Sequence, residues 1–183
     1  MEDKTLYTIT IFSENTVGLL SQVTSVFTRR QLNIETLSVS ASAIDGIHKF
    51  TVTVFCDEET VRKVVLQIDK RVDVLKSYYN TNEELIYQEI ALYKLATSDF
   101  LKISSVEELV RKHNARILDI NENNVVLEKT GHYQETQDLF EELSKSIGVL
   151  QFIRSGRVAI TKSKIERLSD MLAELDKKDK VNS

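Results

Sequence analysis

Hydrophobic and polar residues in the first half of the chain follow two periods in turn. Tyr7, Ile9 and Ile11 alternate with threonines, which is the pattern of a strand with one buried face. From about Thr16 the period changes to that of an amphipathic helix. The apolar stripe of this helix consists of Leu19, Leu20, Val23, Val26 and Phe27. The pattern therefore predicts a strand followed by a helix.

Two more alternating runs follow, at residues 37–41 and 50–54, and Asp45-Gly46 lies between them. An Asp-Gly pair between alternating runs is typical of a β-hairpin turn. The next helix is predicted by an i, i+3, i+4, i+7 spacing, formed by Val61, Val64, Val65 and Ile68. A strand at residues 72–78 completes the order βαββαβ.

The second half repeats this order at a period of about 80 residues, which favours a duplicated architecture. The expected elements are a strand at 87–95, a helix around 106–110, a hairpin of 117–120 and 125–127, a helix around 139–147, and a strand at 149–160 interrupted at Ser155-Gly156. Each half is therefore predicted to be a ferredoxin-like sandwich, in which two helices cover one face of an antiparallel sheet. The predicted fold class is α+β.

The polar cluster at residues 79–84 interrupts the apolar periodicity and marks a domain boundary. We expect domains at 4–79 and 85–162, followed by a charged helical tail at 163–183. Sandwiches of this size have open sheet edges and a modest core, and pairing of two copies relieves both problems. A homodimer is therefore expected, with the sheet edge beside the first helix as its seam.

Composition narrows the class of protein. The chain has 183 residues, of which 42% are hydrophobic and 28% charged, a balance typical of soluble globular proteins. Its formal net charge of -4 argues against nonspecific binding to nucleic acid, which needs clustered Lys and Arg. No apolar run is long enough for a signal peptide or a membrane span, so we expect a cytoplasmic protein with no membrane partner. The single Cys56 and the scattered histidines predict no metal site.

The most informative polar residues surround the first helix. Asn15 and Gly18 lie in the loop before this helix, and Asn33 follows it. Free backbone N–H groups and a partial positive charge gather at a helix N-terminus, so a carboxylate can be held there without a basic side chain. An amide side chain accepts from an ammonium group and donates to a carboxylate. This combination suits a small amino acid.

Four segments, at residues 14–23, 33–39, 72–75 and 154–158, carry a resemblance to a known family. They read Glu-Asn-Thr-Val-Gly-Leu-Leu-Ser-Gln-Val, Asn-Ile-Glu-Thr-Leu-Ser-Val, Val-Asp-Val-Leu and Arg-Ser-Gly-Arg-Val. Over about residues 5–161 the chain resembles the small, regulatory subunit of acetohydroxyacid synthase, also called acetolactate synthase. The resemblance implies an N-terminal ACT domain, an ACT-like second domain and no catalytic residues.

In that family the large subunit condenses pyruvate with pyruvate or 2-oxobutyrate by means of thiamine diphosphate, Mg²⁺ and usually FAD. The resemblance implies that the catalytic large subunit binds these cofactors and that this chain binds none of them. It also implies that this chain raises the activity of its partner and confers feedback inhibition by a branched-chain amino acid, valine above all. The pathway would be the biosynthesis of valine, isoleucine and leucine.

The resemblance also implies an effector site. Three residues match the family's effector-binding positions and three neighbours complete the expected site: Asn15, Gly18 and Asn33, with Val17, Leu19 and Ile34. In ACT dimers the loop that carries the first of these residues faces the other subunit, so a ligand there would stiffen the pairing seam. One residue departs from the family pattern. Gln31 stands where a glycine is common, and it is strained if that position needs a positive φ.

Other interpretations of the same residues are open. Asn15 can be an N-cap and Gly18 a turn residue without any ligand. The run Arg154-Ser-Gly-Arg157 can be a bulge in a long strand or a contact with a partner. A stand-alone amino-acid sensor of the ACT type needs only the first domain and is the main alternative function. An acylphosphatase-like enzyme shares the βαββαβ order, but it needs a phosphate-binding loop, and Glu14 would repel phosphate.

Overall fold

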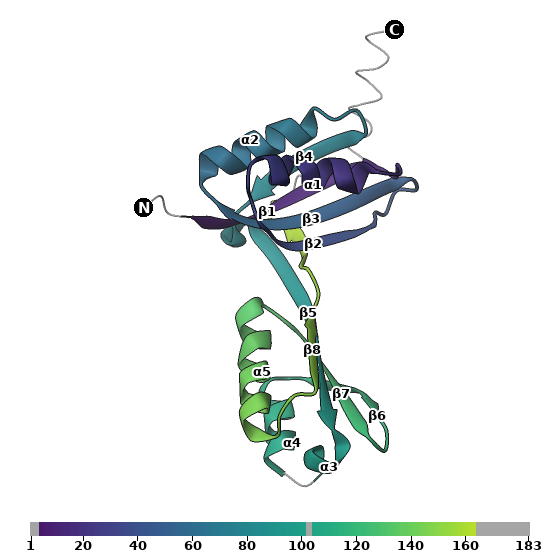
Figure 1. The fold of residues 1–183 in the computed structure, drawn as a ribbon, viewed down its shortest axis with the longest axis vertical. Coiled ribbons are helices and arrows are strands. Elements are labelled where there is room, and N and C mark those ends of the chain that lie inside the picture. Colours follow the sequence, from purple (N-terminus) through teal and green to yellow (C-terminus); the bar gives the residue numbers. More distant parts are fainter. Residues whose placement is uncertain (1–3, 102–103, 164–183) are drawn as a thin grey trace. The chain divides into compact units, whose positions relative to one another are not determined.

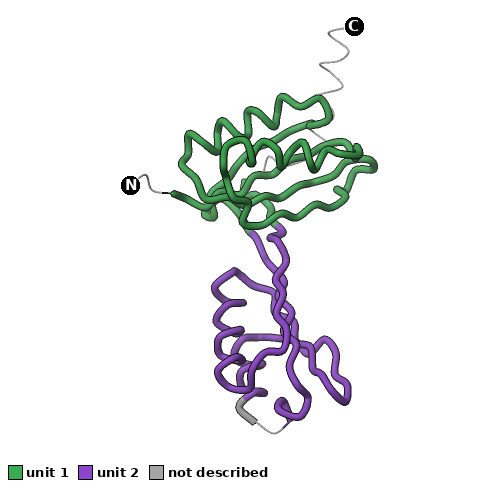
Figure 2. The backbone as a smooth tube through the Cα atoms, in the orientation of Figure 1, with its two compact units in different colours: residues 1–86, 159–183 green, residues 87–158 purple. Residues whose placement is uncertain are grey.

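The computed structural model describes residues 4–101 and 104–163 (Figure 1). The chain forms two compact units (Figure 2). The first unit comprises residues 1–86 and 159–183, and the second comprises residues 87–158. The charged tail expected at 163–183 lies, from residue 164 onward, outside the described residues.

The first unit has the predicted βαββαβ order. Its elements are β1 (Thr5–Glu14), α1 (Leu19–Arg29), β2 (Ile34–Ala41), β3 (Ile47–Cys56), α2 (Glu58–Asp69) and β4 (Val74–Asn80). The strands form a four-stranded antiparallel sheet in the order β2-β3-β1-β4, and both helices cover one of its faces (Figure 1). The ferredoxin-like prediction is therefore confirmed, and β2 and β4 are the edges of this sheet.

The core of the first unit lies between this sheet and its two helices. Its fully buried members include Ile9, Ile11, Val52 and Val54 from the sheet and Val23, Phe27, Val64 and Ile68 from the helices. The alternating strand residues and the periodic helix residues of the sequence are thus the ones that pack together. Full burial of such a side chain contributes roughly 1.5–3 kcal/mol, so this cluster holds the helices on the sheet.

Two predicted element starts in the first unit are wrong. α1 begins at Leu19 rather than near Thr16, because Gly18 has a left-handed backbone with a φ of 87° and prevents an earlier helical turn. Leu20 is consequently turned away from the core and is 46% exposed. β4 begins at Val74, and Val72 is 97% exposed in the preceding turn.

The second unit repeats the sandwich with additions. Its central strand is β5 (Leu85–Ala96), which continues from the short 3₁₀ helix η1 (Asn82–Glu84). The later elements of this unit are α3 (Thr97–Phe100), α4 (Ser104–Lys112), β6 (Arg116–Ile120), β7 (Asn124–Gly131), α5 (Tyr133–Ser146) and β8 (Gln151–Arg154). The last strand, β9 (Val158–Thr161), groups with the first unit from Ala159 onward. The strand order is β6-β7-β5-β8, and β9 also pairs with β5. Its core contains the fully buried Tyr93, Leu127 and Leu139, and the Tyr93 hydroxyl donates to the Thr136 carbonyl at 2.7 Å.

The long closing strand is interrupted where the sequence predicts. β8 ends at Arg154 and β9 begins at Val158. We expected residues up to 162 in the second domain, whereas the chain from Ala159 onward groups with the first unit. Hydrogen bonds account for this difference: Lys49 Nζ donates to the Ala159 carbonyl at 2.7 Å, and Lys162 N–H donates to the Glu84 carbonyl at 2.9 Å.

Candidate functional site

The loop between β1 and α1 is held in place through its backbone. Glu14 N–H donates to the Asp73 carbonyl and Asn15 N–H donates to the Gly46 carbonyl, each at 2.9 Å. Asp73 precedes β4 and Gly46 lies in the connection between β2 and β3, so the loop is tied to both neighbouring connections. The loop therefore has a defined path that delivers Gly18 to the start of α1.

The start of α1 offers unoccupied backbone donors. Its N-cap is Gly18, which supplies no side-chain cap, and its first turn contains no acidic residue. Within the residues that the structure describes, the N–H groups of Val17, Gly18, Leu20 and Ser21 have no hydrogen-bond partner. These donors and the helix dipole together favour a carboxylate.

The six expected site residues differ in exposure. Exposed positions are Asn15, Val17, Gly18 and Asn33, whereas Ile34 is half-buried against the first core and Leu19 is buried within it. The N-cap interpretation of Asn15 is wrong, because Gly18 occupies the N-cap position. In the described part of the chain, the side-chain amides of Asn15 and Asn33 form no hydrogen bond. Both amides are therefore available to a ligand.

The structure places Asn15 and Asn33 at opposite ends of the first sheet. Glu14, the residue before Asn15, pairs with Ile47 at the start of β3. Ile34, the residue after Asn33, pairs with Val54 near the end of β3. Ile47 and Val54 are seven residues apart on β3, which corresponds to a distance of about 24 Å along the strand. One copy of the chain therefore does not bring the two amides together.

Gln31, which follows α1, has a left-handed backbone. Its φ is 54°, and its N–H donates to the Thr28 carbonyl at 3.0 Å. This is the position at which the family resemblance led us to expect a glycine, and the condition for strain is met. A left-handed conformation costs a non-glycine residue roughly 1–2 kcal/mol.

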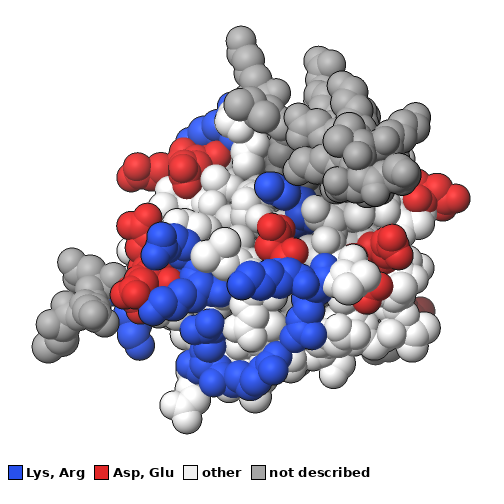
Figure 3. Space-filling view, turned by 90° about the horizontal axis from the view of Figure 1, so that it is seen from above, with Lys and Arg blue, Asp and Glu red and all other residues white. Residues whose placement is uncertain are grey.

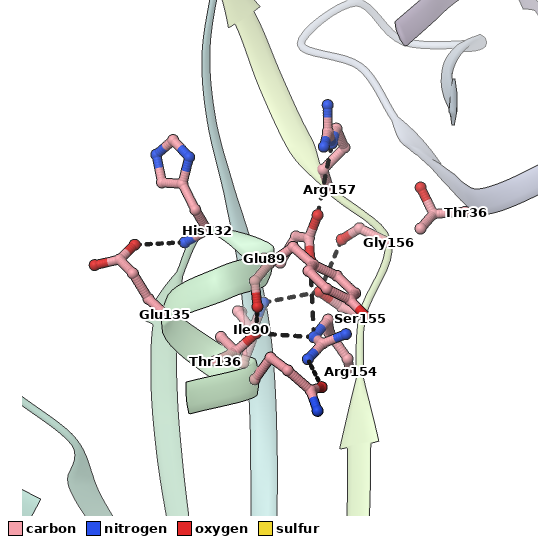
Figure 4. Close-up of polar contacts among 12 residues, drawn as sticks. Thr36, Glu89, Ile90, His132, Glu135, Thr136, Arg154, Ser155, Gly156 and Arg157 are labelled. Carbon is pink, nitrogen blue, oxygen red and sulfur yellow. Dashed lines mark hydrogen bonds and ion pairs between the residues drawn. The ribbon is translucent and has the colours of Figure 1, made fainter. Parts of the chain in front are cut away.

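The run Arg154 to Arg157 surrounds a buried carboxylate. Glu89 on β5 is 3% exposed and lies between the two arginines (Figure 4). Its carboxylate oxygens are 3.9 Å from Arg154 Nε and 3.6 Å from Arg157 Nε. Arg154 Nε also donates to the Thr136 hydroxyl at 2.8 Å, and the Arg157 guanidinium lies 4.0 Å from the centre of the Tyr87 ring.

Ser155 continues the strand pairing between the two arginines. Its N–H donates to the Ile90 carbonyl at 2.8 Å, and its hydroxyl accepts from the Ile90 N–H at 2.9 Å (Figure 4). The bulge interpretation of this run is thereby favoured, since one residue pairs through its side chain and the regular ladder stops. Sequence reasoning missed Glu89, although a carboxylate in the alternation Tyr87, Glu89, Ala91 was a visible signal.

Metal-ligand groups and membrane-spanning helices were sought among the described residues. Across residues 4–101 and 104–163, no three His, Cys, Asp or Glu side chains are grouped so that they could hold a metal ion. In the same residues, no helix has both the length and the apolar character that crossing a bilayer requires. Among the described residues, the open donors at α1 form a candidate site for a carboxylate.

Comparison with known proteins finds relatives along most of the chain. A model of the AHAS small subunit-like ACT domain matches residues 9–76, and a model of the small subunit of acetolactate synthase matches residues 88–176. The acetolactate synthase small subunit of Bacillus subtilis is 27% identical over 162 residues, which cover 88% of this chain and 93% of that protein. A probable acetolactate synthase small subunit of Archaeoglobus fulgidus is 29% identical and covers 85% of this chain and 96% of its own length.

A solved structure shows the same fold. The acetolactate synthase small subunit of Thermotoga maritima superimposes with a TM-score of 0.77, at 23% identity, over 87% of this chain and 99% of that one. The fold and the match at residues 9–76 define an ACT-domain protein with a second, related domain. The chain belongs to the acetolactate synthase small subunit family.

Proposed function

We propose that this chain regulates an acetolactate synthase by binding an amino acid at the interface of two N-terminal ACT domains. The observation that carries the proposal is the separation of Asn15 and Asn33 along β3. A single copy holds two incomplete half-sites, one at each end of its first sheet. A second copy that brings its own Asn33 to Asn15 of the first completes both sites.

The β2 strand is the edge through which we expect two copies to pair. Two β2 strands that pair antiparallel about a two-fold axis place the start of one strand beside the end of the other. At the end of β2, Ala41 pairs with His48 on β3. The residue before His48 is Ile47, which pairs with Glu14 on the other side of β3. This arrangement carries Asn33 of the second copy toward the end of the sheet that holds Asn15.

The chemistry of the half-sites suits an α-amino acid. The N–H groups of Val17, Gly18, Leu20 and Ser21 would bind the carboxylate. The amide oxygens of Asn15 and Asn33 would accept from the ammonium group. The half-buried Ile34 offers an apolar contact, so a branched aliphatic side chain such as that of valine would fit best.

The partner implied by the named relatives is the catalytic large subunit. We expect the large subunit to carry thiamine diphosphate, Mg²⁺ and FAD, whereas this chain contributes no catalytic residue. Association with the small-subunit dimer would favour the active arrangement of the large subunit, and valine at the interface would oppose it. A coupling free energy of about 1–3 kcal/mol between the two sites is sufficient, and it must be reciprocal.

The direct test is an assay of acetolactate formation by the catalytic large subunit, with and without this chain and with valine, leucine or isoleucine. We expect the chain to raise the rate and one of these amino acids to lower it again. Amino-acid binding without any effect on the synthase would instead assign the chain to the stand-alone ACT sensors. No binding and no effect would contradict the proposal outright.

A further inference from the structure

The helical face of the first unit carries a cluster of basic side chains that the proposed effector site does not use. We call it the basic face, and it consists of Arg29, Arg30, Arg62, Lys63 and Lys70. All five residues are exposed. Figure 3 looks down on this face and shows Lys and Arg side chains in a nearly continuous band around uncharged ones, with Asp and Glu at its margin.

Helical spacing brings these residues together. Arg62 and Leu66 on α2 and Lys70 at its C-cap are four residues apart, so they form one row about 12 Å long. Lys63 and Gln67 form the neighbouring row, and Arg30 Nη2 at the end of α1 donates to Gln67 Oε1 at 3.1 Å. The two helices therefore contribute to a single surface.

Most of this positive charge is not neutralised within the unit. Lys63 pairs with Glu59 at 2.7 Å, and this hydrogen bond lowers the pKa of the Glu59 carboxyl. Among the described residues, Arg29, Arg30, Arg62 and Lys70 form no ion pair. Arg29 donates to the carbonyl and to the hydroxyl of Ser25 on its own helix, each at 3.2 Å. A chain with a net charge of -4 thus concentrates unpaired cations on one face.

An apolar side chain lies within this cluster. Leu66 is 54% exposed between Arg62 and Lys70. Protein interfaces combine a small apolar centre with a polar rim, and arginine is enriched in them. Single-stranded nucleic acid is a poorer match, because its sequence-independent binding relies on aromatic side chains for stacking, and this cluster has none.

We propose that the basic face docks a protein surface on which carboxylates surround an apolar pocket that accepts Leu66, and that the catalytic large subunit carries this surface. The inference rests on the proposed function, since the large subunit is the partner. Rim charges of this kind raise the association rate and make it sensitive to salt. The complex would therefore weaken as ionic strength rises.

The test compares two double charge reversals with the same change in net charge. Arg62→Glu with Lys70→Glu alters the basic face, whereas Arg111→Glu with Lys145→Glu alters side chains of the second unit that are 83% and 79% exposed. The affinity of each full-length chain for the purified large subunit is measured at 50 and 300 mM NaCl. We expect the first pair to weaken binding at low salt at least tenfold and to remove most of its salt dependence. The control pair should change affinity less than twofold.

Three outcomes separate the possibilities. Equal binding by the basic-face variant and the wild-type chain overturns the docking inference and leaves the proposed function intact. A wild-type chain that does not bind the large subunit at all removes the proposed function and this inference with it. If the wild-type chain binds duplex DNA and the basic-face variant does not, the basic face is a DNA-binding surface instead. If the wild-type chain self-associates and the variant does not, the basic face pairs two copies of the chain instead. The neutral pair Arg62→Gln and Lys70→Gln, with an unchanged melting temperature, should give an intermediate loss.

Discussion

At the scale of single residues, Gln31 occupies a backbone conformation that favours glycine. Its φ of 54° is a conformation that glycine adopts freely. Gln31 lies between α1 and the exposed Asn33, so the turn that connects α1 to β2 contains a strained residue. The strain is local, because the Gln31 N–H keeps its bond to Thr28.

Replacement of Gln31 by glycine should stabilise the protein. Relief of the left-handed strain exceeds the extra entropy of glycine in the unfolded chain, and the net gain is about 0.5–1 kcal/mol. Urea unfolding measures the change. Arg30→Gly is the matched control, since Arg30 has a φ of -99° and gains nothing from glycine. An equal effect of both substitutions would contradict the assignment of strain to Gln31.

The buried Glu89 is the residue on which the Arg154 to Arg157 segment depends. Glu89→Gln leaves two cations around a neutral amide in a site that is 3% exposed. Removal of one partner from a buried ion pair costs roughly 3–5 kcal/mol. Glu122→Gln, at an exposed position, should change stability by less than about 0.5 kcal/mol. A similar small change at Glu89 in urea unfolding would show that the cluster does not hold the segment.

At the scale of elements, the two helices of the first unit begin in different ways. Asp57 caps α2, and its carboxylate accepts from the Thr60 N–H and from the Thr60 hydroxyl, each at 2.7 Å. α1 has no such cap. The N-terminus of α2 is therefore satisfied by the protein itself, whereas that of α1 is left for a ligand or for water.

The α2 cap predicts a dependence of stability on pH. Hydrogen bonds from Thr60 hold the pKa of Asp57 below its ordinary value of 3.8. The cap therefore stabilises the fold above that value, and this contribution is lost as the pH falls through the lowered pKa. Asp57→Asn keeps an acceptor but does not titrate. In urea unfolding, the stability advantage of the wild-type chain over Asp57→Asn should shrink as the pH falls below 3.8, and it should vanish below the lowered pKa of Asp57. An advantage that is constant with pH would contradict this explanation.

Elements were predictable wherever their apolar period was regular. The strands around Ile9 and Val52 and the helix around Val64 were found because one face of each is buried. The start of α1 was not, since the left-handed conformation of Gly18 is a property of the turn rather than of the periodic pattern. Glu89 was missed because its countercharges come from a segment about 65 residues later in the chain, and periodicity does not report such a pairing.

At the scale of the whole molecule, regulation requires that effector binding can be separated from activation. Gly18→Asp places a carboxylate among the donors of α1, where it repels the carboxylate of an amino acid. We expect this variant to lose valine inhibition and to keep most of its activation of the large subunit. Gly148→Asp is the control, because Gly148 has a comparable φ of 79° and open space around it in the second unit. Equal loss of inhibition and activation in Gly18→Asp alone would contradict this division of roles.

The site itself could be predicted from sequence only in part. Asn15, Gly18 and Asn33 were named from residue chemistry and family resemblance, but their separation of about 24 Å along β3 became visible only with the strand register. A site that two copies share is a property of their symmetry, and one sequence does not contain it. The shared site is for this reason the central claim of the account.

The most direct measurement of that claim mixes two defective chains. Asn15→Ala and Asn33→Ala homodimers should each fail to bind valine. In a mixed dimer, one interface site carries both substitutions and the other carries neither. Equal mixing with full subunit exchange makes half the dimers mixed, so equilibrium dialysis should recover about a quarter of the wild-type sites at wild-type affinity. No recovery after verified exchange would show that each site lies within one chain, and the account would be wrong.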